Sequence, residues 1–594
     1  MCGIAGLFAH GADAPPVDRA ALAAMGERMR TRGPDGEGAW VDAGGRIGLA
    51  HRRLSIIDLS DAALQPMASA DGRRVIVFNG EIYNYRSLRD ELIAQGRRFV
   101  TRSDTEVLLH LYARDGVAML ERLRGMFAFA LWDADRQGIL LARDGFGIKP
   151  LYYTDDGRTL RFSSQVKALI AGGGIDLAPD PAGRVGFFIW GHVPEPWTTF
   201  RNIRALPAGT SMWIDRNGAR KPVVHFDPAE EARKAEAAPR AFDAGELREA
   251  LLDSVRHHLV ADVPVGAFLS AGLDSSTLVG LASEVATEPL RSVTLAFDEY
   301  KGTALDEAPL AETVAAACGT DHRTRRVRGQ DFRDEYARLC AAMDQPSVDG
   351  VNTYFVSKAT AESGLKVALS GLGGDELFGG YDSFRQIPRM VGLLAPFSRL
   401  PALGRGFRLL SAPLLSAVTS PKYASLFEYG GSYGDAYLLR RAMYLPWELP
   451  QVMDPDMAAE GWRTLDAESG LRHQVDGIGS ARLKVSILEA TRYMRSQLLR
   501  DADWAGMAHS LEIRVPLVDT ALFRRLAPML AGSRPPTKRD MALTPSKPLP
   551  AELLDRPKTG FFVPVREWLA GESPQAAERG QRGWAQRVFE DCYR

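Results

Sequence analysis

The chain has 594 residues, of which 45% are hydrophobic and 25% are charged. This composition is ordinary for a globular protein, and the length exceeds what one hydrophobic core usually supports, so we expect two or more domains. The formal net charge of −1 and the lack of a long basic run disfavour nucleic acid and anionic membrane surfaces as partners.

The sequence offers no sign of export or of a membrane-spanning segment. Its most apolar region, residues 390–426, is interrupted by arginine or proline every few residues, whereas a membrane helix needs about 18 consecutive apolar residues. The first residues lack the basic and apolar regions of a secretory signal. The four cysteines, at positions 2, 318, 340 and 592, lack the spacing of a metal site. We therefore expect a cytoplasmic protein in a reducing compartment.

Residues 1–220 are predicted to form short strands separated by turns rich in Gly, Asp and Asn. The expected strands are 4–8, 47–51, 75–79, 127–132 and 139–143. Helical patterns near 18–31 and 85–96 lie between these strands. Residues 221–245 are then polar, charged and rich in alanine, and we interpret them as a linker between domains.

From residue 246 to the end at 594, helices and strands alternate before the chain becomes mainly helical. Helices are expected at 246–260, 275–287 and 307–318, and strands at 263–269 and 291–297. This succession favours a parallel sheet covered by helices. The chain after about residue 385 is predicted to be mostly helical. The predicted fold class is α/β (α+β).

Cys2 is the first candidate for catalysis. Once Met1 is removed, the thiol and a free α-amine belong to one residue, and an amine with a pKa of about 7.7–8.0 can accept the thiol proton near neutral pH. The alternative is that Cys2 is a small buried residue at the start of a strand. The motifs that follow favour catalysis.

Six motifs in the first half support this interpretation together. They are residues 1–6, 32–35, 51–56, 79–84, 103–106 and 143–152. In this order they resemble the class II glutamine amidotransferase domain, an N-terminal-nucleophile fold built as an α/β/β/α sandwich. The resemblance implies that Cys2 attacks the side-chain amide of glutamine, with the Asn79 side chain and the Gly80 N–H as the oxyanion hole. The glutamine-binding residues that it implies are Arg53, Leu54, Ile57, Asn79, Gly80, Glu81 and Asp104.

Within that set, two charged residues match the charges of the substrate. The Arg53 guanidinium suits the α-carboxylate of glutamine through a bidentate pair. Asp104 suits the α-ammonium group, and Glu81 lies nearby in the pattern. The alternative for Arg53 and Asp104 is a surface ion pair.

Residues 270–276 (SAGLDSS) connect a predicted strand to a predicted helix. Free backbone N–H groups and the positive end of a helix suit an anion at such a connection, and the serine hydroxyls add donors. Asp274 could hold Mg²⁺ between phosphate oxygens. The spacing is not that of a Walker loop. It resembles the SGGxDS loop of ATP pyrophosphatases, which release pyrophosphate by making an adenylate.

A second glycine-rich loop, residues 370–381, follows a strand-like segment, and further motifs lie at 501–519 and 556–561. With the first half, they resemble the glutamine-hydrolysing asparagine synthetases over nearly the whole chain. The resemblance implies a parallel-sheet PP-loop domain, in which ATP adenylates a carboxylate and ammonia from glutamine displaces AMP. The ATP-binding residues that it implies are Leu269, Ser270, Gly272, Asp274, Ser275, Ser276, Leu295, Ser370, Gly371, Asp375 and Lys558. Asp274 and Asp375 would hold Mg²⁺.

The chain departs from the family pattern at a few positions. Ala271 replaces a glycine of the phosphate loop. Leu372, at the position linked to intermediate formation, replaces a residue that is often acidic. Asp501 and Trp504 replace Lys and Arg, and Gln165 replaces a common Glu. These changes bear on the acceptor carboxylate more than on the nucleotide.

Three functions are therefore open. The first is the conversion of aspartate to asparagine with release of AMP and pyrophosphate. The second is the same chemistry on a sugar uronate, a peptide or a secondary metabolite. The third is a scaffold that retains only one half-activity. The expected partners are glutamine, ATP and the acceptor carboxylate, and the sequence leaves open whether the chain forms a homodimer.

Overall fold

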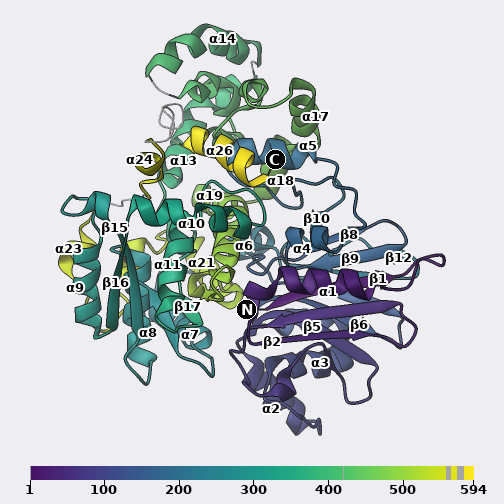
Figure 1. The fold of residues 1–594 in the computed structure, drawn as a ribbon. Coiled ribbons are helices and arrows are strands. Elements are labelled where there is room, and N and C mark those ends of the chain that lie inside the picture. The colour runs from purple at the N-terminus through teal and green to yellow at the C-terminus, as the bar shows by residue number, and fades with distance from the viewer. Residues whose placement is uncertain (1, 400, 419, 557–562, 571–580, 594) are drawn as a thin grey trace.

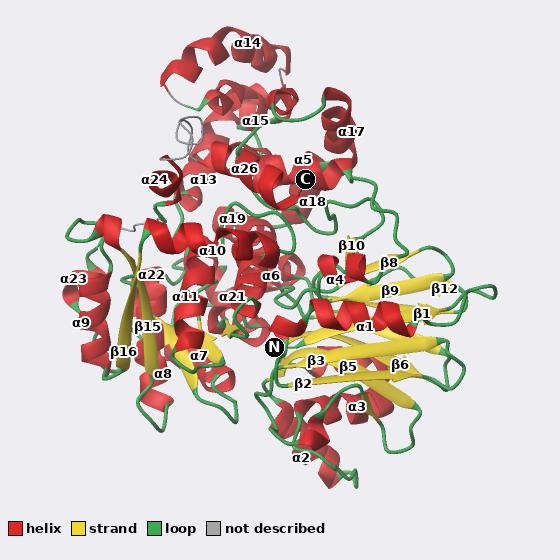
Figure 2. Cartoon of the chain, viewed as in Figure 1, coloured by secondary structure: helices red, strands yellow, loops and turns green. Residues whose placement is uncertain are grey.

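The structure is a computed structural model that describes every residue except 1, 400, 419, 557–562, 571–580 and 594. Two regions that contain β-sheets lie side by side, and a group of helices lies above them (Figures 1 and 2). The N-terminal half holds two mainly antiparallel sheets, and the C-terminal half holds a parallel sheet with helices on both sides.

The first sheet of the N-terminal half has the order β10-β8-β9-β1-β3-β2. Its strands are β1 (Gly3–Ala9), β2 (Gly36–Val41), β3 (Ile47–Arg53), β8 (Tyr152–Asp155), β9 (Thr159–Ser163) and β10 (Arg204–Ala205). The second has the order β12-β11-β7-β6-β5-β4, with β13 also paired to β11. Its strands are β4 (Met67–Ala68), β5 (Arg74–Ile82), β6 (Gly125–Asp133), β7 (Gly138–Arg143), β11 (Thr210–Asp215), β12 (Gly218–Ala219) and β13 (Val223–Val224).

The side-chain pattern of β1 explains the layering. Ile4 and Phe8 point into a core shared with Val75 and Val77 of the second sheet. Leu7 points the other way, into a core shared with helices α1 (Arg19–Arg28) and α4 (Val166–Ala171). A strand covered on both faces is apolar along its whole length rather than alternating. Helices α2 (Tyr85–Ala94) and α3 (Asp104–Asp115) cover the second sheet. The expected α/β/β/α sandwich and its five predicted strands are confirmed.

The parallel sheet of the C-terminal half has the order β16-β15-β14-β17-β18, and all its pairings are parallel. Its strands are β14 (Val265–Phe268), β15 (Arg291–Phe297), β16 (Asp321–Val327), β17 (Val367–Leu369) and β18 (Glu512–Arg514). Helices near it include α7 (Ala244–His258), α8 (Leu273–Val285), α9 (Ala308–Cys318), α10 (Gly329–Ala342), α11 (Val351–Glu362), α12 (Gly374–Phe378), α20 (Arg500–Met507), α21 (Thr520–Leu530), α22 (Lys538–Ala542) and α23 (Ala551–Leu554). The alternation predicted from residue 246 is therefore confirmed.

The remaining helices build the group above the sheets in Figure 1. They are α5 (Pro181–Trp190), α13 (Ser383–Leu394), α14 (Pro401–Val418), α15 (Leu426–Tyr429), α16 (Tyr433–Arg441), α17 (Pro455–Leu465), α18 (Ala467–Val475), α19 (Ala481–Leu488), a π-helix over Glu489–Leu499, α24 (Val565–Ala570) and α26 (Gln581–Tyr593). Among the described residues, none of the helices has the length and apolar character to cross a membrane. Cys340 of α10 and Cys592 of α26 form a disulfide across 252 residues, a pairing that the spacing of the cysteines did not suggest.

The segment that joins the halves contains a packed helix, α6 (Pro228–Ala237). Asp227 caps it, Pro228 occupies its first turn, and the small side chains of Ala229, Ala232 and Ala235 are buried. These alanines belong to the same hydrophobic core as α21. The stretch interpreted as a linker is thus helical over ten residues.

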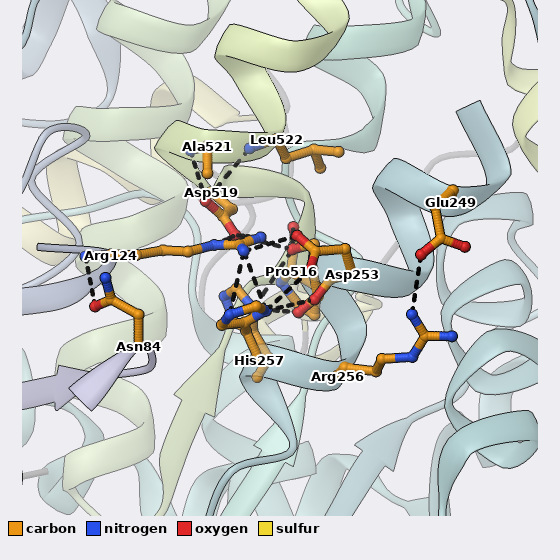
Figure 3. Close-up of polar contacts among 12 residues, drawn as sticks. Asn84, Arg124, Glu249, Asp253, Arg256, His257, Pro516, Asp519, Ala521 and Leu522 are labelled. Carbon is orange, nitrogen blue, oxygen red and sulfur yellow. Dashed lines mark hydrogen bonds and ion pairs between the residues drawn. The ribbon is translucent and has the colours of Figure 1, made fainter. Parts of the chain in front are cut away.

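Arg124 provides one of the polar contacts between the halves (Figure 3). Its guanidinium donates to Asp519 at 2.7 Å and to Asp253 at 2.7 Å, and both carboxylates belong to the C-terminal half. Asp519 also accepts from the N–H of Ala521 and so caps α21. Burial acts to raise the pKa of Asp519, but the Arg124 charge opposes this and the pKa is lowered. The contact therefore fixes the start of α21 to the N-terminal half.

Candidate functional site

Cys2 lies buried just before β1. Its backbone nitrogen donates to Asn79 Oδ1 at 3.0 Å, and its Sγ lies 4.0 Å from the carbonyl oxygen of Leu54. Burial raises the pKa of the Cys2 thiol above its ordinary value. The resting group is therefore a neutral thiol, and it needs a nearby base before it can attack a carbonyl.

Asn79 and Gly80, on β5, have features expected of an oxyanion hole. Because Asn79 Oδ1 accepts from Cys2, the amide orientation is fixed and Nδ2 must point elsewhere. Nδ2 is buried and donates to no residue that the structure describes. A buried donor left unpaired costs about 1–3 kcal/mol, which a bound oxyanion would recover. A Cβ at Gly80 would lie 2.1 Å from the Met126 carbonyl oxygen, so only glycine fits there.

Arg53 and Asp104 are both buried near the thiol site. The Arg53 guanidinium donates to the carbonyl oxygens of Ser60 at 2.9 Å and of Asp58, which fixes its position. Asp104 begins α3 and accepts from the N–H of Ile82 at 2.9 Å. Burial raises the pKa of Asp104 to about 6, so its carboxyl group is mostly ionised at neutral pH. The other glutamine-binding candidates, Leu54 and Ile57, are also buried.

Arg514 brings the C-terminal half into contact with this site. It lies at the end of β18, is fully buried, donates to Glu512 at 2.6 Å and lies 3.5 Å from Glu81 Oε2. Burial and the Glu512 charge raise the pKa of Glu81 well above its ordinary value. The sequence analysis missed Arg514, although it lies within the 501–519 motif, because nothing local indicates that it reaches β5.

A second contact between the halves holds Cys2 itself. Arg32 Nε donates to the Cys2 carbonyl oxygen at 3.0 Å. The other two guanidinium nitrogens donate to both oxygens of Asp503, on α20, at 2.7 and 2.9 Å. Arg32 is fully buried, so this bidentate pair is shielded from water. The backbone of Cys2 is thus tied to a helix of the C-terminal half.

The loop of residues 270–276, which was expected to bind phosphate, connects β14 to α8 and forms hydrogen bonds within itself through its serine hydroxyl groups. Ser270 N–H donates to Ser275 Oγ at 3.1 Å, and Gly272 N–H donates to Ser270 Oγ at 3.2 Å. Ser276 is buried beneath the loop, and its hydroxyl donates to the Ser270 carbonyl oxygen at 3.3 Å. Ala271 is not among the described residues with positive φ, so alanine causes no backbone strain there.

The second glycine-rich loop packs directly against the first. A Cβ at Gly371 would lie 2.9 Å from Ser275 N, and one at Gly374 would lie 2.4 Å from Asp274 Oδ1. The loop's last glycine, Gly380, approaches Asp375 Oδ1 so closely that a Cβ would lie 1.9 Å from it. Because glycine has no side chain, these positions allow the two loops to lie closer together than larger residues would permit.

Lys538 joins the two carboxylates that were expected to hold Mg²⁺. Its Nζ lies 2.5 Å from Asp274 Oδ2 and also forms an ion pair with Asp375. Although burial acts to lower it, the two carboxylates raise the pKa of Lys538. Asp274 and Asp375 thus converge on a single cation, as two ligands of one metal ion would. The sequence analysis missed Lys538, because the segment around it matches no phosphate-binding motif.

A cavity of about 1480 Å³ opens over the two loops. Among the expected ATP-binding residues, those that line it are Leu269, Ser270, Gly272, Asp274, Ser275, Leu295, Ser370, Gly371 and Asp375. Leu372 and Lys538 line the same cavity. Of the other two candidates, Ser276 is buried and does not line the cavity, and Lys558 lies outside the described residues. One cavity therefore contains most of the candidates that were scattered along the sequence.

Asp501 and Trp504 lie behind one wall of this cavity. Asp501 accepts from Ser347 Oγ at 2.8 Å and from Trp504 Nε1 at 2.7 Å. Burial and the neighbouring Asp349, which lines the cavity, raise the pKa of Asp501 to about 8. Asp501 is therefore mostly protonated at neutral pH. Gln165, which replaces the Glu common in the family pattern, directly precedes α4. The first N–H of α4, that of Val166, donates to Asp344 of the C-terminal half at 2.8 Å.

The comparisons with known proteins agree with the two halves. The glutamine amidotransferase domain model matches residues 1–225, and the asparagine synthase model matches residues 246–590. Asparagine synthetase [glutamine-hydrolyzing] 1 of Bacillus subtilis is 33% identical over 587 residues, which cover 96% of this chain and 88% of that protein. Asparagine synthetase B [glutamine-hydrolyzing] of Escherichia coli is 33% identical over 65% of this chain and 66% of that protein. The chain therefore belongs to the asparagine synthase family and is a carbon–nitrogen ligase of the glutamine-hydrolysing type.

Proposed function

We propose that the enzyme adenylates a carboxylate with ATP, releases pyrophosphate, and forms an amide when ammonia from glutamine displaces AMP. Aspartate, which would become asparagine, is the first candidate for the acceptor. The observation that carries the proposal is the convergence of Asp274 and Asp375 on one amine across two interlocked glycine loops, at the floor of the cavity. Opposed carboxylates beside a phosphate loop suit a nucleotide bound with a divalent cation.

The N-terminal half supplies the nitrogen in this proposal. Cys2 attacks the glutamine amide after its thiol proton passes to a base, for which the free α-amine of processed Cys2 is the candidate. Asn79 Nδ2 and the Gly80 N–H donate to the oxyanion that develops. Arg53 would pair with the α-carboxylate of glutamine, and Asp104 with its α-ammonium group. Leu54, Ile57 and Glu81 would complete the glutamine site.

The C-terminal half activates the acceptor. Ser270, Gly272, Ser275, Ser370 and Gly371 would hold the phosphates, and Leu269 and Leu295 would contact the rest of the nucleotide. Asp274 and Asp375 are the residues that would hold Mg²⁺, which when bound supplies positive charge to the phosphate oxygens. Ser276 and Lys558 stay candidates for the same site. Lys538 would add a positive charge to the site that does not depend on a bound metal ion.

A different acceptor is the second candidate. Leu372 lines the cavity at a position that is often acidic in this family. Asp349 also lines the cavity, and its charge contributes to the raised pKa of Asp501 behind it. Both features favour an acceptor whose recognition differs from that of aspartate. A scaffold with one half-activity is disfavoured, because the chain keeps the candidate residues Cys2 and Asn79 in one half and Asp274 and Asp375 in the other.

The test is a pyrophosphate-release assay with purified enzyme, glutamine, ATP and Mg²⁺, run against a panel of carboxylates that includes aspartate. We expect pyrophosphate and AMP with one acceptor, and amide formation that depends on glutamine. The Asp375→Asn enzyme should lose pyrophosphate release but keep its glutaminase activity. ADP and phosphate as the main nucleotide products would overturn the proposal.

A further inference from the structure

Helix α14 presents its apolar side to solvent. It lies at the top edge of Figure 1, farther from the sheets than the other helices. Among the α14 side chains that the structure describes, Arg405 is the only exposed one that is not apolar. A surface helix normally shows the opposite polarity, with polar residues outward and apolar residues toward the core.

The exposed apolar residues of α14 form a continuous stripe. Leu403, Phe407, Leu410 and Leu414 recur at spacings of four, three and four residues, which places them on one face. Their exposed fractions are 50%, 37%, 79% and 74%. The opposite face contacts the protein: Gly404 is buried, and Arg408 donates to Glu428 at 2.9 Å. The orientation of the helix is therefore fixed with the stripe outward.

Three further exposed apolar residues lie near this stripe in the chain, Leu393 and Phe397 before α14 and Leu409 within it. We call the whole surface the α14 patch, which consists of Leu393, Phe397, Leu403, Phe407, Leu409, Leu410 and Leu414. These seven are nearly half of the sixteen large hydrophobic side chains that are exposed in the described part of the chain, yet they lie within 22 residues. Exposed apolar side chains concentrated in this way mark an interaction site rather than ordinary surface variation.

The segment that carries the patch has charges of one sign only. Residues 383–427 contain six cationic side chains and no Asp or Glu, but carboxylates that flank the segment pair with two of them, Asp382 with Arg385 and Glu428 with Arg408. The six are Arg385, Arg389, Arg399, Arg405, Arg408 and Lys422. Arg389 and Arg405 are exposed, and neither forms an ion pair with any residue that the structure describes. The patch therefore carries uncompensated positive charge beside its apolar stripe.

We propose that the α14 patch docks on the surface of an anionic lipid bilayer, with the apolar stripe in the interfacial region and the arginines among the headgroups. An amphipathic helix with an apolar face and basic residues is the form of peripheral helix that binds such surfaces. A second copy of the chain is a poorer occupant, because a self-complementary contact would bring two basic patches together. The expectation of no membrane partner rested on the net charge of the whole chain, which averages this basic segment with acidic surface elsewhere.

The experiment measures co-flotation of the full chain with vesicles of phosphatidylcholine alone or of phosphatidylcholine mixed with phosphatidylglycerol. We expect binding to the anionic vesicles and little to the neutral ones. The triple variant L403Q/L410Q/L414Q removes apolar stripe and R389Q/R405Q removes charge, and each should weaken binding by roughly tenfold or more. The matched control V223Q/V224Q makes the same kind of change at two exposed residues of β13 and should bind as the wild type does.

Three results would overturn the proposal. One is the absence of binding to anionic vesicles. Another is binding that neither set of variants weakens. The third is a protein that dimerises in sedimentation equilibrium, ignores vesicles, and becomes monomeric in the triple variant, which would assign the patch to a second copy. Because the substituted side chains are exposed and outside both catalytic sites, pyrophosphate release should be unchanged and serves as the test of folding.

Discussion

At the thiol site, a buried hydrogen-bond donor without a partner indicates where a negatively charged group could bind. Asn79 uses Oδ1 to fix the position of Cys2, and this leaves Nδ2 as a buried donor without a partner among the described residues. At the next position, Gly80, the neighbouring backbone leaves no room for a side chain. An unpaired buried donor such as Asn79 Nδ2 costs stability in the free protein and is useful only when negative charge appears beside it.

Replacing Cys2 with alanine should separate the two activities. Of the other three cysteines, Cys318 lies in the C-terminal half and Cys340 and Cys592 form a disulfide, so none of them can replace this thiol. Glutamine-dependent amide formation should fall to background. Amide formation from added ammonium should persist and increase with pH, because the free NH₃ fraction increases. Product amide is measured with each nitrogen source, and substantial glutamine-dependent activity in the mutant would contradict the assignment.

Lys538 gives a second prediction at this scale. The Lys538→Gln enzyme leaves Asp274 and Asp375 close together without the amine between them, and pyrophosphate release should fall by about a hundredfold or more. The matched control is Lys547→Gln, the same change nine residues later, since Lys547 is exposed and does not line the cavity. Pyrophosphate release is measured at saturating ATP. Equal activity of the two variants would show that Lys538 is not part of the site.

Among the elements, α20 combines several roles. Ala502 lines the cavity, Asp503 holds Arg32, and Asp501 and Trp504 bond to each other behind the cavity wall. One short helix thus contributes to both sites and to the contact between the halves.

The Asp501→Asn variant should alter the pH dependence of stability. The pKa of Asp501 is raised to about 8 in the folded chain, so the folded state holds a proton that the unfolded state releases above about pH 4. Wild-type stability should therefore decrease as the pH rises from about 4 to about 8. Asparagine keeps an acceptor for Trp504 Nε1 but does not titrate. The variant should gain in Tm relative to the wild type across this range, and a constant difference would contradict the shifted pKa.

The elements also show how far the sequence can be interpreted. Strands such as β1 and β5 were predicted because long apolar runs between glycine-rich turns are local signals. Helix α6 was missed, since its buried face consists of Pro228 and three alanines, which resemble the composition of a linker. Lys538 and Arg514 were missed for another reason: each acts on residues that are far away in sequence, and no local pattern encodes that distance. The composition of α14 was visible, but its outward orientation became visible only in the folded chain.

For the whole molecule, the interface between the halves combines apolar contacts, such as that of Phe146 with Phe523, with charged contacts that differ in burial. The pair of Arg32 with Asp503 is buried, whereas Lys366 contacts Asp35 at 2.8 Å with both side chains partly exposed. Buried pairs and exposed pairs respond very differently to the loss of one partner.

Removing one partner from each pair should expose this difference. Asp503→Ala leaves the Arg32 charge buried and should destabilise the protein by about 3–5 kcal/mol and also impair glutaminase activity. The control, Lys366→Gln, cuts a contact between the same halves and should cost about 1 kcal/mol or less. Urea unfolding and glutamine hydrolysis are measured for both. Similar losses in the two variants would mean that the buried pair has no special role.

The link through Arg32 has a consequence for ligand binding. α20 contributes Ala502 to the cavity and, through Asp503 and Arg32, holds the carbonyl group of Cys2. If a ligand in the cavity binds more tightly when α20 has one position rather than another, it also favours the position of the Cys2 backbone that goes with it. Thermodynamic reciprocity then requires that glutamine and the acceptor change each other's affinity by the same factor. Each dissociation constant, measured with and without the other ligand, would therefore give a single coupling free energy for two reactions that take place in different halves of the chain.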